Sequence, residues 1–256
     1  MDDNEKKEIN ENLSEIDIDL EQELYKRKRK IRITAIIVII TFTLFLFRPL
    51  IQSLNLPSLN FLKESHDLSK DPKIKKLKES VVEIKHDKKM GTGFNIRNDG
   101  LIVTNKHVIK DAEYININFL NGKKYTVNDF SIDKRVDLAL IDIDANNLSY
   151  LKLGDSTNFK RNMEVLIIGN PLGYEKVVNK AKLLKKVNYK GMQNEILILK
   201  GPIHKGSSGS PVLNKERKVI GIVFATGYIK GIDERLGFAI SIKDLKKFLK
   251  ERNKLN

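Results

Sequence analysis

From about Lys73 onward, the sequence is a series of short apolar or alternating runs separated by turn-forming residues. Runs of this length and period are typical of strands. They cover residues 80–84, 93–96, 101–104, 114–119, 138–143, 163–168, 195–199, 211–213, 219–224 and 237–240. The breaks include Asn98-Asp99-Gly100, Asn121-Gly122 and Asn170-Pro171. So many short strands at this spacing predict an all-β barrel or sandwich.

Only residues 242–252 of this part show helical spacing, with Leu245, Phe248 and Leu249 on one side. The chain has 256 residues, which is enough for one good-sized core plus appendages. It contains no cysteine, so neither disulfides nor thiolate metal sites contribute. We therefore predict one folded domain that ends in a helix and is held together by burial alone.

The formal net charge of +14 is unevenly distributed. Residues 1–24 carry ten acidic residues and two lysines, a net charge of −8, so the remainder carries +22. The lysines of the remainder are scattered between apolar runs, without Trp and without a zinc-finger, RNA-binding or helix-turn-helix motif. We interpret the charge as a solvated basic surface that suits anionic lipid headgroups, and we expect no nucleic-acid partner.

Residues 33–47 contain no charge and are framed by Arg32 and Arg48. Fifteen helical residues rise about 22 Å, less than a hydrocarbon core of about 30 Å, but arginines that snorkel extend the span to residues 31–50. A cleaved signal peptide and a buried core helix are the alternatives. The run begins about thirty residues into the chain, no small-residue cleavage site follows, and it is apolar all round. We predict a membrane-spanning helix over 31–50.

The orientation of this helix is predicted from its flanks. Five consecutive basic residues, 26–30, precede the span, whereas only Arg48 and Lys63 lie in the twenty residues after the uncharged run 33–47. Basic flanks stay on the cytoplasmic side. We therefore expect an acidic, then basic, cytoplasmic tail over 1–30, a single pass through the cell membrane, a linker over 51–72, and an extracytoplasmic domain over 73–256.

The segment 206–211, Gly-Ser-Ser-Gly-Ser-Pro, places Ser208 in a tight turn between glycines. A hydrolase that uses serine needs such a hydroxyl, an imidazole to take its proton and a carboxylate to orient the imidazole. Gly206 can adopt a backbone conformation barred to other residues, so its N–H can converge with that of Ser208 on one oxygen. Gly209 removes a side chain that would crowd the nucleophile. An ordinary Ser/Gly turn is the alternative.

His107 and Asp137 are the candidate partners of Ser208. Among the four histidines, His107 ends a strand-like run, 101–108, and Asp137 opens another, 137–141. A structural histidine and a turn-capping aspartate are the alternatives. The order His, Asp, Ser at the edges of β segments is that of the double-β-barrel proteases. We predict His107 as the base, Asp137 as its orienting group and Ser208 as the nucleophile, with no metal or cofactor.

Seven stretches resemble the HtrA/Deg branch of trypsin-like serine proteases and follow that family's order. They are residues 91–94, 99–108, 137–140, 153–156, 168–173, 206–211 and 237–240. The similarity covers roughly residues 80–252. It implies a chymotrypsin/trypsin-like double β-barrel of two six-stranded barrels, with the active site in the cleft between them. It also implies an endopeptidase that cuts exposed or misfolded polypeptides, with a homotrimer as the first expectation.

Two features depart from the family's pattern. The family usually has Asn before the nucleophile and Gly two residues after it, where this chain has Ser207 and Ser210. This form also resembles bacterial glutamyl endopeptidases. Many HtrA proteins carry a PDZ domain after the protease, and because this chain stops at Asn256 we expect none here. A protease-fold scaffold that binds polypeptide without cutting it, and a processing protease with one partner, are the functional alternatives.

The resemblance places the primary specificity pocket between the residues before the nucleophile and the strand after it. The expected lining is Ile203, Phe224, Ala225 and Thr226. None is acidic, and a buried cationic substrate side chain without a partner is costly, so cleavage after Lys or Arg is not expected. Glutamyl endopeptidases have His where this chain has Val223. We predict an apolar pocket that accepts Val, Ala, Ile or Leu, with positive charge from His204 or Lys205 as the alternative.

Overall fold

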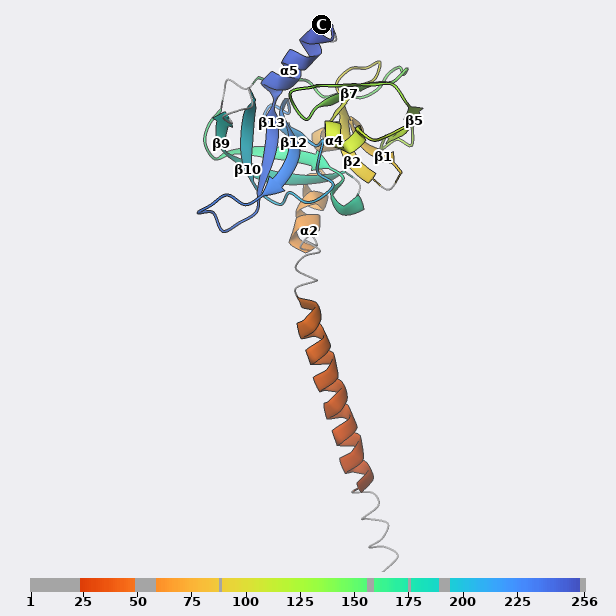
Figure 1. Cartoon of the computed structure of the whole chain (residues 1–256), viewed down its shortest axis with the longest axis vertical. Coiled ribbons are helices and arrows are strands. Elements are labelled where there is room, and N and C mark those ends of the chain that lie inside the picture. The colour runs from red at the N-terminus through yellow and green to blue at the C-terminus, as the bar shows by residue number, and fades with distance from the viewer. Residues whose placement is uncertain are drawn as a thin grey trace, which may run out of the picture. The chain divides into compact units, whose positions relative to one another are not determined.

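The structure, a computed structural model, describes residues 24–48, 59–87, 89–155, 159–174, 176–188 and 194–253. It divides into two compact units, Met1–Leu56 and Pro57–Asn256. The described part of the first unit is one helix, Leu24–Arg48, orange-red in Figure 1, with a mean hydropathy of 2.1 in its most apolar window. Its length and apolar composition suit a membrane span, and signal sequences share these features. The predicted tail before Leu24 lies outside the described residues.

The second unit is mostly β-structure (Figure 1). Its elements are α2 (Leu59–Leu68), α3 (Pro72–Glu79), β1 (Val81–His86), β2 (Lys89–Asn95), β3 (Leu101–Thr104), α4 (Lys106–Ile109), β4 (Ile115–Asn118), β5 (Lys124–Val127), β6 (Phe130–Ile132), β7 (Ala139–Asp142), β8 (Met163–Gly169), η1 (Pro171–Gly173), β9 (Val177–Asn188), β10 (Glu195–Lys200), β11 (Pro211–Leu213), β12 (Val219–Gly227), β13 (Leu236–Ser241) and α5 (Ile242–Glu251).

The first sheet has the strand order β5-β4-β1-β2-β3-β7-β6 and is antiparallel throughout. Its edge strands β5 and β6 are consecutive in the chain and are separated only by residues 128 and 129. The two edges of the sheet are therefore joined by a short connection, but no pairing between β5 and β6 closes it among the described residues. The first sheet is a half-barrel of seven strands, called the first barrel below, in place of the six-stranded barrel that the resemblance implied.

The second sheet closes into a barrel of six strands in the order β10-β13-β12-β11-β8-β9. β9 alternates buried and exposed residues over much of its length, because successive side chains of a strand point to opposite faces. The buried residues that fill this barrel include Val165, Ile167, Leu183, Leu197, Leu199, Val212 and Ala239. The predicted all-β, double-barrel fold is confirmed.

One apolar cluster joins both barrels to the closing helix α5. It includes Phe94, Leu101, Val103 and Leu140 from the first sheet, Leu166, Ile168, Leu213 and Ile222 from the second, and Leu245, Phe248 and Leu249 from α5. Burying each such side chain contributes about 1.5–3 kcal/mol, so the cluster fixes how the two barrels meet. Ser241 caps α5 by accepting the N–H of Lys243 at 3.3 Å. The helix predicted over 242–252 is present.

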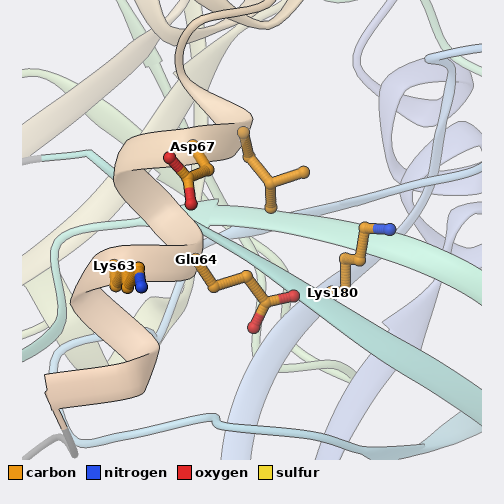
Figure 2. Close-up of a pocket in the computed structure, with 5 residues that line it drawn as sticks. Lys63, Glu64, Asp67 and Lys180 are labelled. Carbon is orange, nitrogen blue, oxygen red and sulfur yellow. The ribbon is translucent and has the colours of Figure 1, made fainter.

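The predicted linker, 51–72, contains the helix α2, which contacts β9. Ser65 is buried, and its hydroxyl accepts the backbone N–H of Val178 at 3.0 Å. Pro72 is the first residue of α3, a position that proline favours, with Asp71 as N-cap. Pro72 therefore marks the start of a helix. Figure 2 shows the shallow hollow beside α2, lined by Lys63, Glu64, Asp67, Leu68 and Lys180, none of which is a predicted site residue.

Candidate active site

His107 is the second residue of α4, the short helix that follows β3. Its ring Nδ1 lies 2.5 Å from Oδ2 of Asp137, and its backbone N–H donates to Oδ1 of the same carboxylate at 2.9 Å. Because a carboxylate only accepts hydrogen bonds, Nδ1 carries the proton and Nε2 of the neutral ring carries a lone pair. The His107 side chain is 44% exposed. Asp137 thus orients an accessible imidazole with its basic nitrogen pointing away from the carboxylate.

Two buried polar side chains position the loop that carries Asp137. Asn105, wholly buried just before α4, donates from Nδ2 to the Asp137 carbonyl oxygen at 2.8 Å. Asp133 is also buried, and Oδ1 accepts the N–H groups of Arg135 at 2.7 Å and Val136 at 3.2 Å. Burial acts to raise the pKa of Asp133, but these donors and the Arg135 charge hold that pKa below its usual value.

Arg135 also ties this loop to the closing helix. Its guanidinium donates to Oε1 of Glu251 at 3.0 Å and to Oε2 at 2.5 Å, a bidentate pair, while it also contacts Asp133 at 3.2 Å. Glu251 is the last residue of α5. The position of Asp137 therefore depends on a helix that lies more than a hundred residues later in the chain.

Ser208 lies in a loop that turns on two glycines with positive φ, Gly206 (+94°) and Gly209 (+86°). A Cβ on Gly209 would lie 1.8 Å from the carbonyl oxygen of Thr92, so only glycine fits there. The half-buried Ser208 hydroxyl donates to the carbonyl oxygen of Phe224 at 3.4 Å. In the described part of the chain, no hydrogen bond joins that hydroxyl to the His107 ring.

The serine loop and the helix α4, which carries His107, contact neighbouring residues of strand β2. Gly91 packs against Val108, the residue after His107, so closely that a Cβ would lie 2.7 Å from a valine methyl group. At the next position, the N–H of Thr92 donates to the carbonyl oxygen of Ser208 at 2.9 Å. Ser208 and His107 therefore both lie beside β2, where the two barrels meet.

The backbone amides of the loop fall into two groups. Those of Ser207, Gly209 and Ser210 donate to the carbonyl oxygens of His204 (3.1 Å), Val223 (2.8 Å) and Ser207 (3.0 Å). Among the residues that the structure describes, the amides of Gly206 and Ser208 have no acceptor. Two amides without an acceptor are what a developing oxyanion requires, and the assignment of these two to an oxyanion hole stays a prediction.

The residues predicted to line the substrate pocket do not share one environment. Ile203 is buried in the interior of the second barrel and packs against Gly237. Phe224 is half-buried against the cluster between the barrels, and Ala225 and Thr226 are half-buried on β12. Ile203 and Phe224 thus belong to different apolar clusters, and the pocket that they were expected to form together stays a prediction.

The alternative of a positively charged pocket depended on His204 and Lys205. Burial, and then the nearby charge of Arg235, lower the pKa of His204 below its usual value. The ring is therefore uncharged at neutral pH. Lys205 is exposed. His204 thus offers no charge for an acidic substrate side chain.

Sequence reasoning missed the polar side chains behind this site. Thr92 and Asn170, both wholly buried, connect β2 and the end of β8 to the serine loop. Both lie in stretches that resemble the family, 91–94 and 168–173. A polar residue next to a glycine in such a stretch was the signal that could have identified them.

Comparison with known proteins gives a consistent result. Residues 91–222, just over half of the chain, match the family described as trypsin-like peptidase domain. A relative from Chlamydia muridarum (strain MoPn / Nigg), named probable periplasmic serine endoprotease DegP-like, is 34% identical over 163 residues, covering 60% of this chain and 31% of the relative. The chain thus spans about a third of the length of the curated relatives it matches.

Solved structures show the same fold. A serine endoprotease from Yersinia pestis has a TM-score of 0.59 and 26% identity, covering 71% of this chain and 65% of that one. The HtrA-type protease AlgW with a tripeptide has a TM-score of 0.63 and 24% identity, covering 70% and 63%. The predicted HtrA/Deg-like, trypsin-fold relationship is confirmed, and the chain belongs to the trypsin-like peptidase domain family.

Proposed function

We propose that this chain is a serine endopeptidase in which Ser208, His107 and Asp137 form the catalytic triad. The observation that carries the proposal is the His107–Asp137 pair, which uses both carboxylate oxygens and leaves Nε2 as a base. The serine loop, 206–209, offers the Ser208 hydroxyl and two amides without an acceptor among the described residues. Nucleophile, base, orienting group and oxyanion donors are the parts that acyl transfer requires.

The proposed reaction has two steps. Ser208 Oγ adds to the substrate carbonyl carbon as its proton passes to His107 Nε2, and the amides of Gly206 and Ser208 stabilise the oxyanion. The imidazolium then protonates the leaving amine, which gives an acyl-enzyme. Water adds to the acyl carbon as His107 takes its proton, and the imidazolium then protonates the leaving Ser208 Oγ, which releases the acid product and regenerates the free enzyme. Asp137 keeps Nδ1 protonated and stabilises the imidazolium throughout.

We further propose that the protein is anchored in the cell membrane by the helix Leu24–Arg48, with the N-terminus in the cytoplasm and the peptidase domain outside. The apolar helix and the basic block 26–30 support this orientation. The proposed layout is a tail over 1–30, a span over 31–50, a connecting segment over 51–72 that includes α2, and the peptidase from 73 onward. Exposed or misfolded polypeptides are the proposed substrates, and a homotrimer is the proposed assembly.

One observation favours a second candidate, a protease-fold scaffold that binds polypeptide without cutting it. The Ser208 hydroxyl donates to Phe224, not to His107. Catalytic hydrogen bonds are often poorly aligned without substrate and tighten when it binds, so this geometry is also compatible with an enzyme. The two candidates differ in whether Ser208 reacts.

The deciding experiment is active-site labelling of the full chain in detergent with a fluorophosphonate, followed by digestion of an unfolded protein. We expect stoichiometric labelling and cleavage, both lost in Ser208→Ala. Ser149→Ala, which removes a hydroxyl that donates to Glu79 at 2.9 Å, is the matched control. Unlabelled wild-type protein that still binds unfolded polypeptide would establish the scaffold. Mapping the cut bonds tests the pocket, because dominant cleavage after Lys, Arg or Glu would contradict the predicted preference for Val, Ala, Ile or Leu.

A further inference from the structure

Thr92, which belongs to the first barrel, makes four hydrogen bonds to residues outside β2. Its N–H donates to the carbonyl oxygen of Ser208 (2.9 Å), and its carbonyl oxygen accepts from the Thr104 hydroxyl (2.8 Å). Its own hydroxyl donates to the carbonyl oxygen of Gly206 (3.0 Å) and accepts the N–H of Asn170 (2.9 Å). The side chain is wholly buried, so breaking these bonds is not compensated by solvent.

The direction of the Thr92 hydroxyl is determined by its partners. A backbone N–H can only donate, so Oγ1 accepts from Asn170 and its proton is committed to the Gly206 carbonyl. Asn170 is itself held in place, because its side chain donates to the Val82 carbonyl oxygen at 3.0 Å and accepts the N–H of Lys176 at 2.8 Å. The hydrogen-bonded chain therefore runs from β1 through Asn170 and Thr92 into the serine loop.

Thr92 thus holds the carbonyl groups of the two residues, Gly206 and Ser208, whose amides have no acceptor among the described residues. Glycine has a wide choice of φ and ψ, so the peptide groups around Gly206 can rotate unless something restrains them. The Thr92 hydroxyl restrains the orientation of the Gly206 carbonyl, and its N–H restrains that of Ser208. The restrained carbonyls belong to the peptide groups Gly206–Ser207 and Ser208–Gly209. These two groups flank the Ser207–Ser208 peptide, which carries the Ser208 N–H, and the first also adjoins the peptide that carries the Gly206 N–H. Thr92 of the opposite barrel thus restrains the backbone next to both amides.

We propose that Thr92 is the positioning residue of the oxyanion hole, held in register by Asn170. This inference rests on the proposed function, because it assigns a role in the same reaction. The alternative role, a bond that merely holds the barrels together, would affect stability without selectively affecting the transition state. Oxyanion stabilisation acts on the transition state, so losing it lowers kcat more than it raises KM.

The test compares three variants of the full chain in detergent micelles, with a peptide substrate and thermal unfolding. Thr92→Val has the same shape without the hydroxyl, and we expect kcat to fall about 10- to 100-fold with KM changed less than about 3-fold. Thr92→Ser restores the hydroxyl and should recover kcat to within about 3-fold of wild type. The control is Thr126→Val, which removes an exposed hydroxyl bonded to Asn116 at 2.8 Å and should leave kcat unchanged.

A peptide boronate provides a second measurement. Ser208 Oγ adds to boron while its proton passes to His107, and an oxygen of the tetrahedral adduct takes the oxyanion position. In Thr92→Val the inhibition constant should rise by the factor by which kcat/KM falls, while the affinity for a product peptide stays constant. If the valine variant does not fold, Thr92→Ala replaces it.

The outcomes separate the two proposals. Active wild-type protein with a folded hydroxyl-free variant of equal kcat would refute the role of Thr92 and leave the triad standing. A parallel loss of product-peptide affinity would also refute it, since that indicates general disorder of the cleft. Wild-type protein without turnover would refute the proposed function and this inference together.

Discussion

Replacing Asp137 by asparagine tests the proposed mechanism most directly. The carboxylate accepts two hydrogen bonds from His107, one from the backbone N–H and one from Nδ1, so both of its oxygens are used. An asparagine has one carbonyl oxygen and one NH2 group, so it satisfies only one of these donors. If the carbonyl takes the backbone N–H, the NH2 group faces Nδ1 and favours the tautomer with its proton on Nε2. That tautomer cannot accept the Ser208 proton.

The expected loss is about 10³- to 10⁴-fold in kcat, the size found when this tautomer is lost in other enzymes with such a triad. At about 1.36 kcal/mol per factor of ten, this corresponds to about 4–5.5 kcal/mol of activation free energy. Stability should change far less, because the Asp137 side chain is 26% exposed and the substitution keeps its shape.

The assay is steady-state hydrolysis of a fluorogenic peptide by the full chain in detergent, with the unfolding midpoint measured in parallel. Asp142→Asn is the matched control, because Asp142 lies on the strand after Asp137 and pairs with Arg97 at 3.3 Å outside the site. We expect this control to retain wild-type kcat. A loss of less than about 10-fold in a folded Asp137→Asn variant would refute the tautomer argument.

Three further predictions follow from the structure. Ser210 Oγ is buried without a hydrogen-bond partner among the described residues, so Ser210→Ala should raise the free energy of unfolding by about 1 kcal/mol in urea denaturation. Ser241→Ala, which removes a helix cap, should lower it by a similar amount. A lower free energy of unfolding in Ser210→Ala would show that a bound water satisfies the hydroxyl. The folded state lowers the pKa of His204, so its contribution to stability is present above about pH 6.5 and is lost as the pH falls through the folded-state value. His204→Asn should therefore flatten the fall in stability between pH 7.5 and 5, and an unchanged slope would exclude His204 as its cause. For the membrane topology, Lys190→Cys should react with an impermeant thiol reagent on intact cells while Glu5→Cys should not, and the reverse pattern would invert the proposed orientation.

The sequence predicted those parts of the fold that depend on local pattern. Strands with turn signals between them, and the helix after Ser241, were recognisable because their periodicity directly reflects which side chains are buried. α2 was not recognised, because its docking depends on Ser65 and on strand β9, which lies more than a hundred residues later. The prolines around it suggested a linker, although proline also marks helix starts.

For the site, the order of His107, Asp137 and Ser208 along the chain was enough to nominate them. The supporting residues were not nominated, because their roles arise from hydrogen bonds between distant segments. Thr92 bonds to Gly206, 114 residues away, and Arg135 to Glu251, 116 residues away. Ile203 was nominated from its place before Ser208, and its side chain is buried in the apolar cluster of the second barrel, so its place in a substrate pocket stays a prediction.

The contacts of α5 with the Asp137 loop and with both barrels have a consequence for the order of events during synthesis. The apolar cluster between the barrels and the partner of Arg135 both include residues of α5, which follow His107, Asp137 and Ser208 in the chain. While a ribosome is still making the protein, the proposed anchor helix and the three proposed triad residues are produced before α5, which packs against both barrels. We therefore expect nascent chains truncated before Ile242 to resist fluorophosphonate labelling. If the proposed function holds, the site would stay incomplete until α5 has docked.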